Sequence, residues 1–161
     1  MLIGIISDTH DHIEHTKQAV SLFKQRNVDV VIHAGDYCSP FMIPLFEGLP
    51  MQGVFGNNDG DLQTLLKKAD EADVEIAGGF LEVKADDCSI AVYHGTYQGI
   101  TDALHSCGKY DVVISGHTHE TVSKRVGNTL AINPGTANGF DGDATIAFLD
   151  TDAMEVVFTT L

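Results

Sequence analysis

The sequence is poor in basic residues, has few cysteines, contains no tryptophan and has no long apolar run. Only 9 Lys and Arg stand against 23 Asp and Glu, which gives a net charge of -14 at pH 7. Such an excess of negative charge repels nucleic acid backbones and anionic membranes. We therefore expect no membrane partner and regard nucleic acid as an unfavoured one, although a small anionic substrate is not excluded.

The cysteines also limit where the protein works. Cys38, Cys88 and Cys107 are odd in number and include no C-x-x-C pair. This pattern predicts free thiols in a reducing compartment, and the cytoplasm fits. The opening segment MLIGIIS lacks the cationic start of a signal peptide and is too short for its apolar core, so we interpret it as the first strand.

A chain of 161 residues with 43% hydrophobic content is expected to form a single domain over residues 1–161. Short runs rich in Ile and Val predict buried strands: LIGIIS, DVVIHAG, GVFG, IAVYHG and DVVISG. Helical patterns lie between them, at residues 13–26, 39–48, 61–72 and about 99–107. In the last third, segments 121–135 and 145–159 are typical of antiparallel hairpins. The pattern indicates an α/β domain with a partly parallel sheet extended or faced by antiparallel strands.

The helix boundaries carry their own signals. Asp11 followed by Glu14 resembles a capping box that would begin the first helix. Ser39 is expected to cap the second helix with Pro40 in its first turn, and Pro44 should keep that helix short or bent.

Polar residues of the metal-binding type follow five of the predicted strands. They are Asp8, His10, Asp36, Asn57, His94, His117 and His119. In open α/β sheets, ligands bind beyond the carboxyl ends of the strands, so these residues can converge there. Residues i and i+2 of extended backbone point to the same side, which predicts that each His or Asp pair aims at one point. Gly116 is expected to permit the sharp exit from its strand.

Each of these residues has an ordinary alternative when taken alone. Asp8 or Asn57 could form a turn, and Asp36 could cap the following segment. Turn chemistry does not explain four histidines and three oxygen ligands at the ends of strands. Seven ligands are too many for one zinc ion and suit two metal ions that share a carboxylate.

The other histidines are assigned different roles. His15 and His105 lie in helical patterns and are expected to face solvent. His33 lies inside a predicted strand and is expected to be a core residue with its hydrogen bonds satisfied. His12 is close to the proposed cluster and is a candidate contact for substrate.

The motifs SDTH, GDY, GNND, HG and GHTH occur in this order over residues 7–119. In this respect the sequence resembles the calcineurin-like metallophosphoesterases, and more closely their compact phosphodiesterase branch, which also includes the retromer subunit of the same fold. The segment NPGT at residues 133–136 extends the resemblance. It implies a four-layer αββα sandwich of two mixed sheets flanked by helices, with a two-metal centre at one end.

Carried over position by position, the resemblance implies two sets of ligands that share Asp36. Asp8, His10, Asp36 and His119 would bind one metal ion, and Asp36, Asn57, His94 and His117 would bind the other. Oxygen and imidazole donors without thiolate suit Mn, Fe, Ni or Zn, and Mn is our first candidate. The implied enzyme is a phosphoesterase, most closely a phosphodiesterase, that hydrolyses a small phosphate ester.

The expected mechanism needs no side-chain nucleophile. Two divalent ions can lower the pKa of a bridging water towards about 7, and the resulting hydroxide would attack the phosphorus. We place catalysis on Asp36, Asn57 and His94, together with Asn58. The wider family has G-N-H-[DE] where this chain has GNND, so the histidine that would protonate the leaving oxygen is replaced by Asn58. Asp59 is expected either to orient the site or to cap the next helix.

Other classes fit less well. The sequence has no G-x-x-x-x-G-K-[ST] and no G-x-G-x-x-G, and Glu120 and Thr121 interrupt the H-x-H-x-D-H pattern of metallo-β-lactamases. The main alternative is a non-catalytic, protein-binding scaffold with the same fold. A homo-oligomer is compatible with the sequence, which carries no signal for it.

Overall fold

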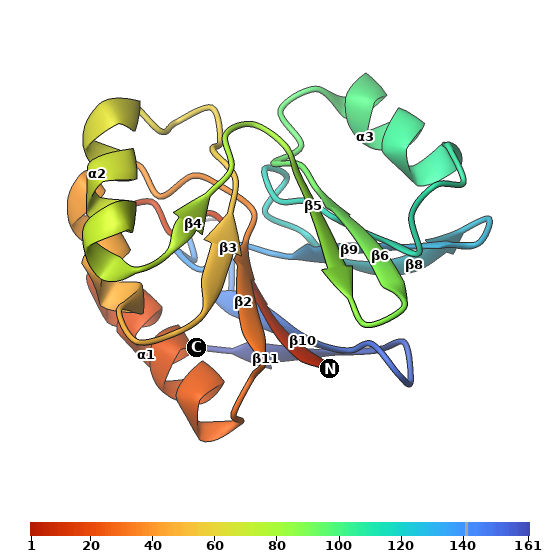
Figure 1. Cartoon of the computed structure of the whole chain (residues 1–161), viewed down its shortest axis with the longest axis horizontal. Helices are drawn as coiled ribbons and strands as arrows, with labels where there is room; N and C mark the ends of the chain where they lie inside the picture. Colours follow the sequence, from red (N-terminus) through yellow and green to blue (C-terminus); the bar gives the residue numbers. More distant parts are fainter. Residues whose placement is uncertain (141) are drawn as a thin grey trace.

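The computed structural model describes residues 1–140 and 142–161. Two mixed β-sheets pack face to face, and helices cover both outer faces (Figure 1). The first sheet has the order β11 (Glu155–Thr160), β10 (Thr145–Asp150), β1 (Leu2–Ile6), β2 (Val30–His33), β3 (Met51–Gly53), β4 (Glu75–Ile76). The second has the order β5 (Leu81–Ala85), β6 (Cys88–Val92), β7 (Val112–Ile114), β9 (Thr129–Pro134), β8 (Thr121–Val126). The predicted four-layer αββα fold is confirmed.

Three apolar layers hold the sheets and helices together. The helices α1 (Ile13–Gln25), η1 (Pro40–Phe46) and α2 (Leu62–Ala72) cover the first sheet, and α3 (Gln98–Ser106) covers the second. Strand β2 shows why the sequence has continuous apolar runs. Its Val30 and Ile32 face the second sheet, whereas Val31 faces the helices. Both faces of the strand are buried, as in other parallel sheets covered on both sides.

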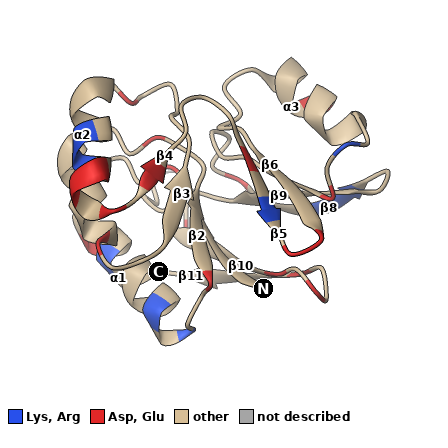
Figure 2. Ribbon diagram, in the orientation of Figure 1, with Lys and Arg blue, Asp and Glu red and all other residues tan. Residues whose placement is uncertain are grey.

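The parallel pairs set the direction of the site. Strands β1 to β4 run parallel in register, and in the second sheet β6, β7 and β9 do the same. Their carboxyl ends therefore lie at one end of the molecule, where the loops of both sheets meet (Figure 1). The Lys and Arg residues of the described part of the chain are spread over several helices and strands (Figure 2). No helix within residues 1–140 and 142–161 has the length and hydropathy to cross a membrane.

Some of the sequence predictions were wrong in detail. The capping box does not form: His12 caps α1 by accepting the N–H of His15 at 3.2 Å, and the Asp11 carboxylate instead accepts from Ser39. Strand β3 ends at Gly53, so the rest of GVFG lies beyond it. Strands β4 and β5 were not predicted, because two-residue and half-exposed strands carry little apolar signal. The prediction of a short helix around Pro44 is confirmed as a 3-10 helix.

His33 is the buried core histidine that the sequence predicted. Its side chain is 0% exposed, its Nδ1 accepts the N–H of Gly35 at 3.1 Å, and its ring stacks on Tyr37. Burial lowers the pKa of His33 to about 3. An unfolded chain protonates histidine near pH 6.5. The stabilisation from neutral His33 is thus fully present above pH 6.5 and is lost as the pH falls towards 3.

We predict that His33 lowers the free energy of unfolding by about 1.4 kcal/mol for each unit by which the pH falls between pH 6 and pH 4. His33→Phe keeps an aromatic ring but has no titratable group, so its stability should depend less steeply on pH. Urea denaturation of the metal-free proteins at pH 7, 6, 5 and 4 measures both slopes. Equal slopes in the two proteins would contradict this assignment.

Candidate metal centre

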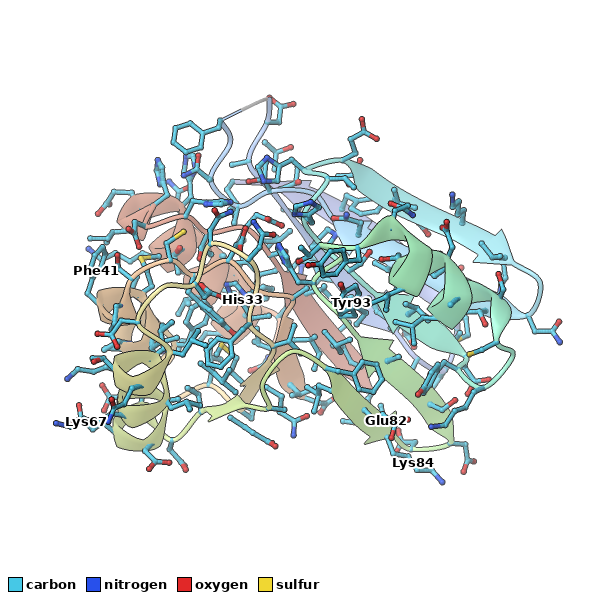
Figure 3. All side chains as sticks on the ribbon, turned by 90° about the horizontal axis from the view of Figure 1, so that it is seen from above. His33, Phe41, Lys67, Glu82, Lys84 and Tyr93 are labelled. Atoms are coloured by element: carbon cyan, nitrogen blue, oxygen red, sulfur yellow. The ribbon has the colours of Figure 1, made fainter. Side chains whose placement is uncertain are left out.

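The seven residues singled out in the sequence lie in the loops that follow β1, β2, β3, β6 and β7. Figure 3 looks down on this end of the molecule. His33, the last residue of β2, and Tyr93, which follows β6, lie on either side of the middle. Both sheets therefore contribute to one site. This arrangement agrees with the rule that ligands bind beyond the carboxyl ends of strands.

The sequence predicted extended backbone at these residues, but the structure does not have it there. Asp8, His10, Asp36, His117 and His119 all have positive φ, between 39° and 69°. The left-handed conformation costs an ordinary residue about 1 to 2 kcal/mol. Such strain persists where surrounding contacts hold it, and it gathers at functional sites. The side chains converge because the loops turn sharply at the ligands themselves.

Asp8 lies at the centre of the first group of side chains. Its Oδ1 is 3.6 Å from Nε2 of His10 and 3.3 Å from Nε2 of His119. Its other oxygen, Oδ2, accepts hydrogen bonds from Ser7 Oγ at 2.5 Å and from the N–H of His117 at 3.0 Å. One oxygen of this fully buried carboxylate is thus satisfied by the protein, and the other faces imidazole nitrogens.

Both oxygens of Asp36 accept hydrogen bonds from Asn58, and one of them also faces imidazole nitrogens. Its Oδ2 lies 3.5 Å from Nε2 of His10 and 3.3 Å from Nε2 of His94. Its Oδ1 accepts the N–H of Asn58 at 2.8 Å. Asp36 is therefore close to histidines from both expected ligand sets. Asp8 also belongs to both compact groups, Asp8 with His10 and His119, and Asp8 with Asp36 and His94.

Three buried atoms at this point have no hydrogen-bond partner: Asp8 Oδ1, His10 Nε2 and His94 Nε2. Leaving a buried polar atom unsatisfied costs about 1 to 3 kcal/mol. Donor atoms bound to one divalent ion at about 2.1 Å lie roughly 3.0 to 3.4 Å apart. The observed separations of 3.3 to 3.6 Å are close to that spacing. The residues present fit divalent metal ions.

Asn57 and His117 are also brought to the site. The ring of His117 meets the ring of His94 edge on, with centroids 5.2 Å apart. Oδ1 of Asn57 accepts a hydrogen bond from Thr96 Oγ1 at 3.3 Å, two residues beyond His94. The structure thus brings His117 beside His94, while Asn57 contacts the loop that carries His94.

Charge and burial compete in setting the pKa values of the two carboxyl groups. Burial alone would raise the pKa of Asp8, but the neighbouring imidazoles of His10 and His119 move it well below its usual range. Burial also opposes ionisation of Asp36, and His94 together with Asn58 lowers its pKa overall. Both groups are therefore charged at neutral pH, as metal ligands must be.

Asp59 holds the loops that carry the site. Its buried carboxylate accepts backbone N–H groups from Asp36 at 3.1 Å, Gly56 at 2.7 Å and Cys38 at 2.8 Å. Burial raises its pKa, and these hydrogen bonds partly offset that effect. Asp61, not Asp59, caps α2. Of the two roles expected for Asp59, orienting the site is the one observed.

The segment NPGT, residues 133–136, also holds the end of the two sheets at which the site lies. Asn133 donates from Nδ2 to the carbonyl of Gly116 at 2.8 Å, and Thr136 donates to the carbonyl of Asp8 at 3.1 Å. These contacts tie the loops of both sheets together. The contacts of Ser7 and Cys38, each within two residues of a proposed ligand, were not predicted from the sequence.

The remaining histidines differ from the predictions. His15 does not face solvent freely: it is half-buried, stacks on His12 and contacts the carbonyls of Ala137 and Asn138 through Nδ1. His105 is also half-buried, and its Nε2 is inaccessible. Helical spacing did not reveal the contacts of His15 with Ala137 and Asn138, because these two residues are more than 120 positions away in the sequence. A contact between His12 and substrate stays a prediction.

Gly116 is required for a reason other than the one expected. Its φ is not positive, whereas the histidines at 117 and 119 adopt the left-handed conformation themselves. A Cβ at position 116 would overlap Ser7 Oγ and lie 2.6 Å from Asp8 Oδ2. The glycine allows the turn after β7 to approach the carboxylate of Asp8.

A fold of two mixed sheets with a histidine and carboxylate centre at the strand ends defines a class of metal-dependent hydrolases. The model of the calcineurin-like phosphoesterase superfamily domain matches residues 1–154. The chain belongs to this superfamily.

Individual relatives agree with this assignment. A phosphodiesterase from Methanocaldococcus jannaschii is 42% identical over 161 residues, which cover 96% of both chains. A solved archaeal phosphodiesterase has a TM-score of 0.95 at 39% identity, with complete coverage of both chains. Vps29 from Entamoeba histolytica, complexed with Zn²⁺, has a TM-score of 0.68 at 16% identity, covering 100% of this chain and 98% of that one. The last similarity shows the fold alone.

We predict that Gly116→Ala displaces Asp8 and destabilises the protein by about 1 to 3 kcal/mol, the usual cost of overpacking. Its metal affinity should fall at the same time. Gly99→Ala is the matched control, because a Cβ there meets nothing within 4 Å. Thermal unfolding and Mn²⁺ titration test both variants, and a Gly116→Ala protein that binds Mn²⁺ like the wild type would contradict the prediction.

Proposed function

We propose that this protein is a phosphodiesterase that hydrolyses a small phosphate ester with two divalent metal ions. The observation that carries the proposal is the pair of buried carboxylates, Asp8 and Asp36, each with an oxygen that faces buried imidazole nitrogens without hydrogen-bond partners. The similarity to a phosphodiesterase over nearly the whole chain supports the ester type. Residues 1–161 act as one catalytic domain.

The ligand sets follow the grouping of side chains. Asp8, His10, Asp36 and His119 hold one ion, while Asp36, Asn57, His94 and His117 hold the other. When bound, the two ions would act as Lewis acids towards the phosphate oxygens and would lower the pKa of a water molecule towards about 7. Mn²⁺ is the first candidate because the donors are oxygen and imidazole, with Fe, Ni and Zn also suited to them.

The side chains of the site fix orientation and charge. Asp36 contacts His10 of one ligand set and His94 of the other, so it fixes the position of one set relative to the other. The Nδ1 atom of His94 lies 2.7 Å from the carbonyl of Ala34, to which it donates when Nε2 faces a metal ion. A phosphate held by ions at these residues would be attacked in line with its leaving oxygen.

Asn58 does not supply a proton to the leaving group. Its Nδ2 donates to Asp36 Oδ2 at 2.8 Å, and its backbone N–H donates to Asp36 Oδ1. An amide does not titrate near neutral pH and offers only hydrogen bonds. Asn58 therefore supports Asp36, and the leaving oxygen departs without a positioned general acid.

The cysteines bear on the compartment, and the metal-type residues bear on the choice between enzyme and scaffold. Cys38, Cys88 and Cys107 are all free thiols, which supports a reducing location such as the cytoplasm. A protein-binding scaffold of the same fold would not need seven metal-type residues around two buried carboxylates. The complete set favours the enzyme over the scaffold.

We predict that chelation abolishes hydrolysis of bis-p-nitrophenyl phosphate and that Mn²⁺ restores it. Asp36→Ala should reduce turnover to the background rate because Asp36 contacts both ligand sets, whereas His10→Ala should leave part of the activity. Steady-state assays after metal removal and addition measure these effects.

Two folded variants provide the control for this prediction. His94→Ala and His117→Ala should lose turnover while circular dichroism shows an unchanged fold. Hydrolysis that survives in both variants would come from a contaminating enzyme, and the scaffold would then be the better account.

We predict a steep dependence of rate on the pKa of the leaving group, with nitrophenyl esters cleaved far faster than alkyl esters. General acid catalysis is typically worth about 10² to 10⁴ in rate, and Asn58 cannot provide it. Asn58→His should flatten the slope in part. Similar rates for alkyl and aryl diesters, with chemistry shown to be rate-limiting, would mean that another group such as His12 donates the proton.

A further inference from the structure

We propose that Cys38 is a positioning residue that orients His10 for metal binding through a hydrogen bond to its Nδ1 atom. This inference rests on the proposed function. It concerns a cysteine that lies two residues after Asp36, outside the expected ligand sets.

The two nitrogens of His10 have different surroundings. Nε2 lies 3.6 Å from Asp8 Oδ1 and 3.5 Å from Asp36 Oδ2 and has no hydrogen-bond partner. Nδ1 lies 3.2 Å from Sγ of Cys38. A histidine that binds metal through Nε2 must keep its lone pair there, so Nδ1 carries the hydrogen and donates it. The sulfur of Cys38 is the acceptor in that state.

The position of Cys38 is fixed independently of its side chain. Its φ of 71° is left-handed, and its backbone N–H donates to Oδ1 of Asp59 at 2.8 Å. The same carboxylate of Asp59 also accepts the N–H of Asp36. One buried group therefore places both the metal-facing carboxylate and the thiol that supports His10.

The contact needs only the acceptor capacity of sulfur. A thiol sulfur is a weak hydrogen-bond acceptor. Sγ of Cys38, 3.2 Å from Nδ1, can therefore hold the ring of His10 in place.

His94 provides the internal comparison. Its Nδ1 lies 2.7 Å from the carbonyl of Ala34, a stronger acceptor than a thiol, and its side chain is only 1% exposed. The side chain of His10 is 16% exposed. We therefore expect the two metal ions to bind unequally, with the weaker one at the half of the site that contains His10 and Cys38.

Calorimetric titration of the metal-free protein with Mn²⁺ tests this role. The wild type should bind two ions in two steps. Cys38→Ala should weaken the weaker step by about 10 to 100 fold, the usual effect of removing such a supporting contact, and leave the tighter step within about twofold. Cys38→Ser should retain more affinity than Cys38→Ala because a hydroxyl can still accept from Nδ1.

Cys107→Ala is the matched control. Cys107 is exposed at the end of α3, where its thiol donates a hydrogen bond to the carbonyl of Leu104 at 3.2 Å. Its substitution should leave both binding steps unchanged. The backbone contact between position 38 and Asp59 survives in Cys38→Ala, and circular dichroism checks that this variant is folded.

A second measurement separates orientation from simple packing. In the Zn²⁺-loaded protein, ¹⁵N-edited NMR should detect the Nδ1 proton of His10, and this proton should exchange with water faster in Cys38→Ala. Wild-type affinity for both ions in Cys38→Ala would overturn the role of Cys38. Equal losses in the Ala and Ser variants with unchanged proton exchange would also overturn it. A wild type that binds no metal ion would overturn the proposed function as well.

Discussion

Burial of two carboxylates side by side is the constraint on which the rest of the site depends. Asp8 and Asp36 are 0% and 1% exposed, and removing such charges from water is costly unless each finds compensation. Hydrogen bonds from Ser7 and His117 satisfy one oxygen of Asp8, and Asn58 donates to both oxygens of Asp36. Asp8 Oδ1 and Asp36 Oδ2 also face imidazole nitrogens, and this is the arrangement that divalent cations complete.

The fold meets this constraint by packing rather than by local preference. Five of the seven proposed ligands have positive φ, which none of them favours alone. The loops are held by Asp59, by Asn133 and Thr136, and by the close approach of Gly116 to Asp8. These contacts join both sheets at one end. The free energy of burying two sheets and their helices thus supports a strained but preorganised site.

The sequence predicted an α/β domain and the meeting of polar residues at strand ends, because continuous apolar runs and their polar endings depend only on local order. The four layers were implied by the resemblance to the family. The sequence did not predict the geometry. Asp8 and His10 were assumed to lie in extended backbone, yet both are left-handed, since contacts across more than a hundred residues decide their φ angles. Likewise, nothing near Asp59 or Cys38 in the sequence shows that one accepts hydrogen bonds from the loop carrying the other.

The account requires two metal ions that share Asp36. Crystals grown with Mn²⁺ and measured at a wavelength where manganese scatters anomalously would locate the ions directly. The account predicts two anomalous peaks about 3.5 to 4 Å apart, with the carboxylate of Asp36 between them. A single peak, or two peaks without Asp36 as a common ligand, would contradict it.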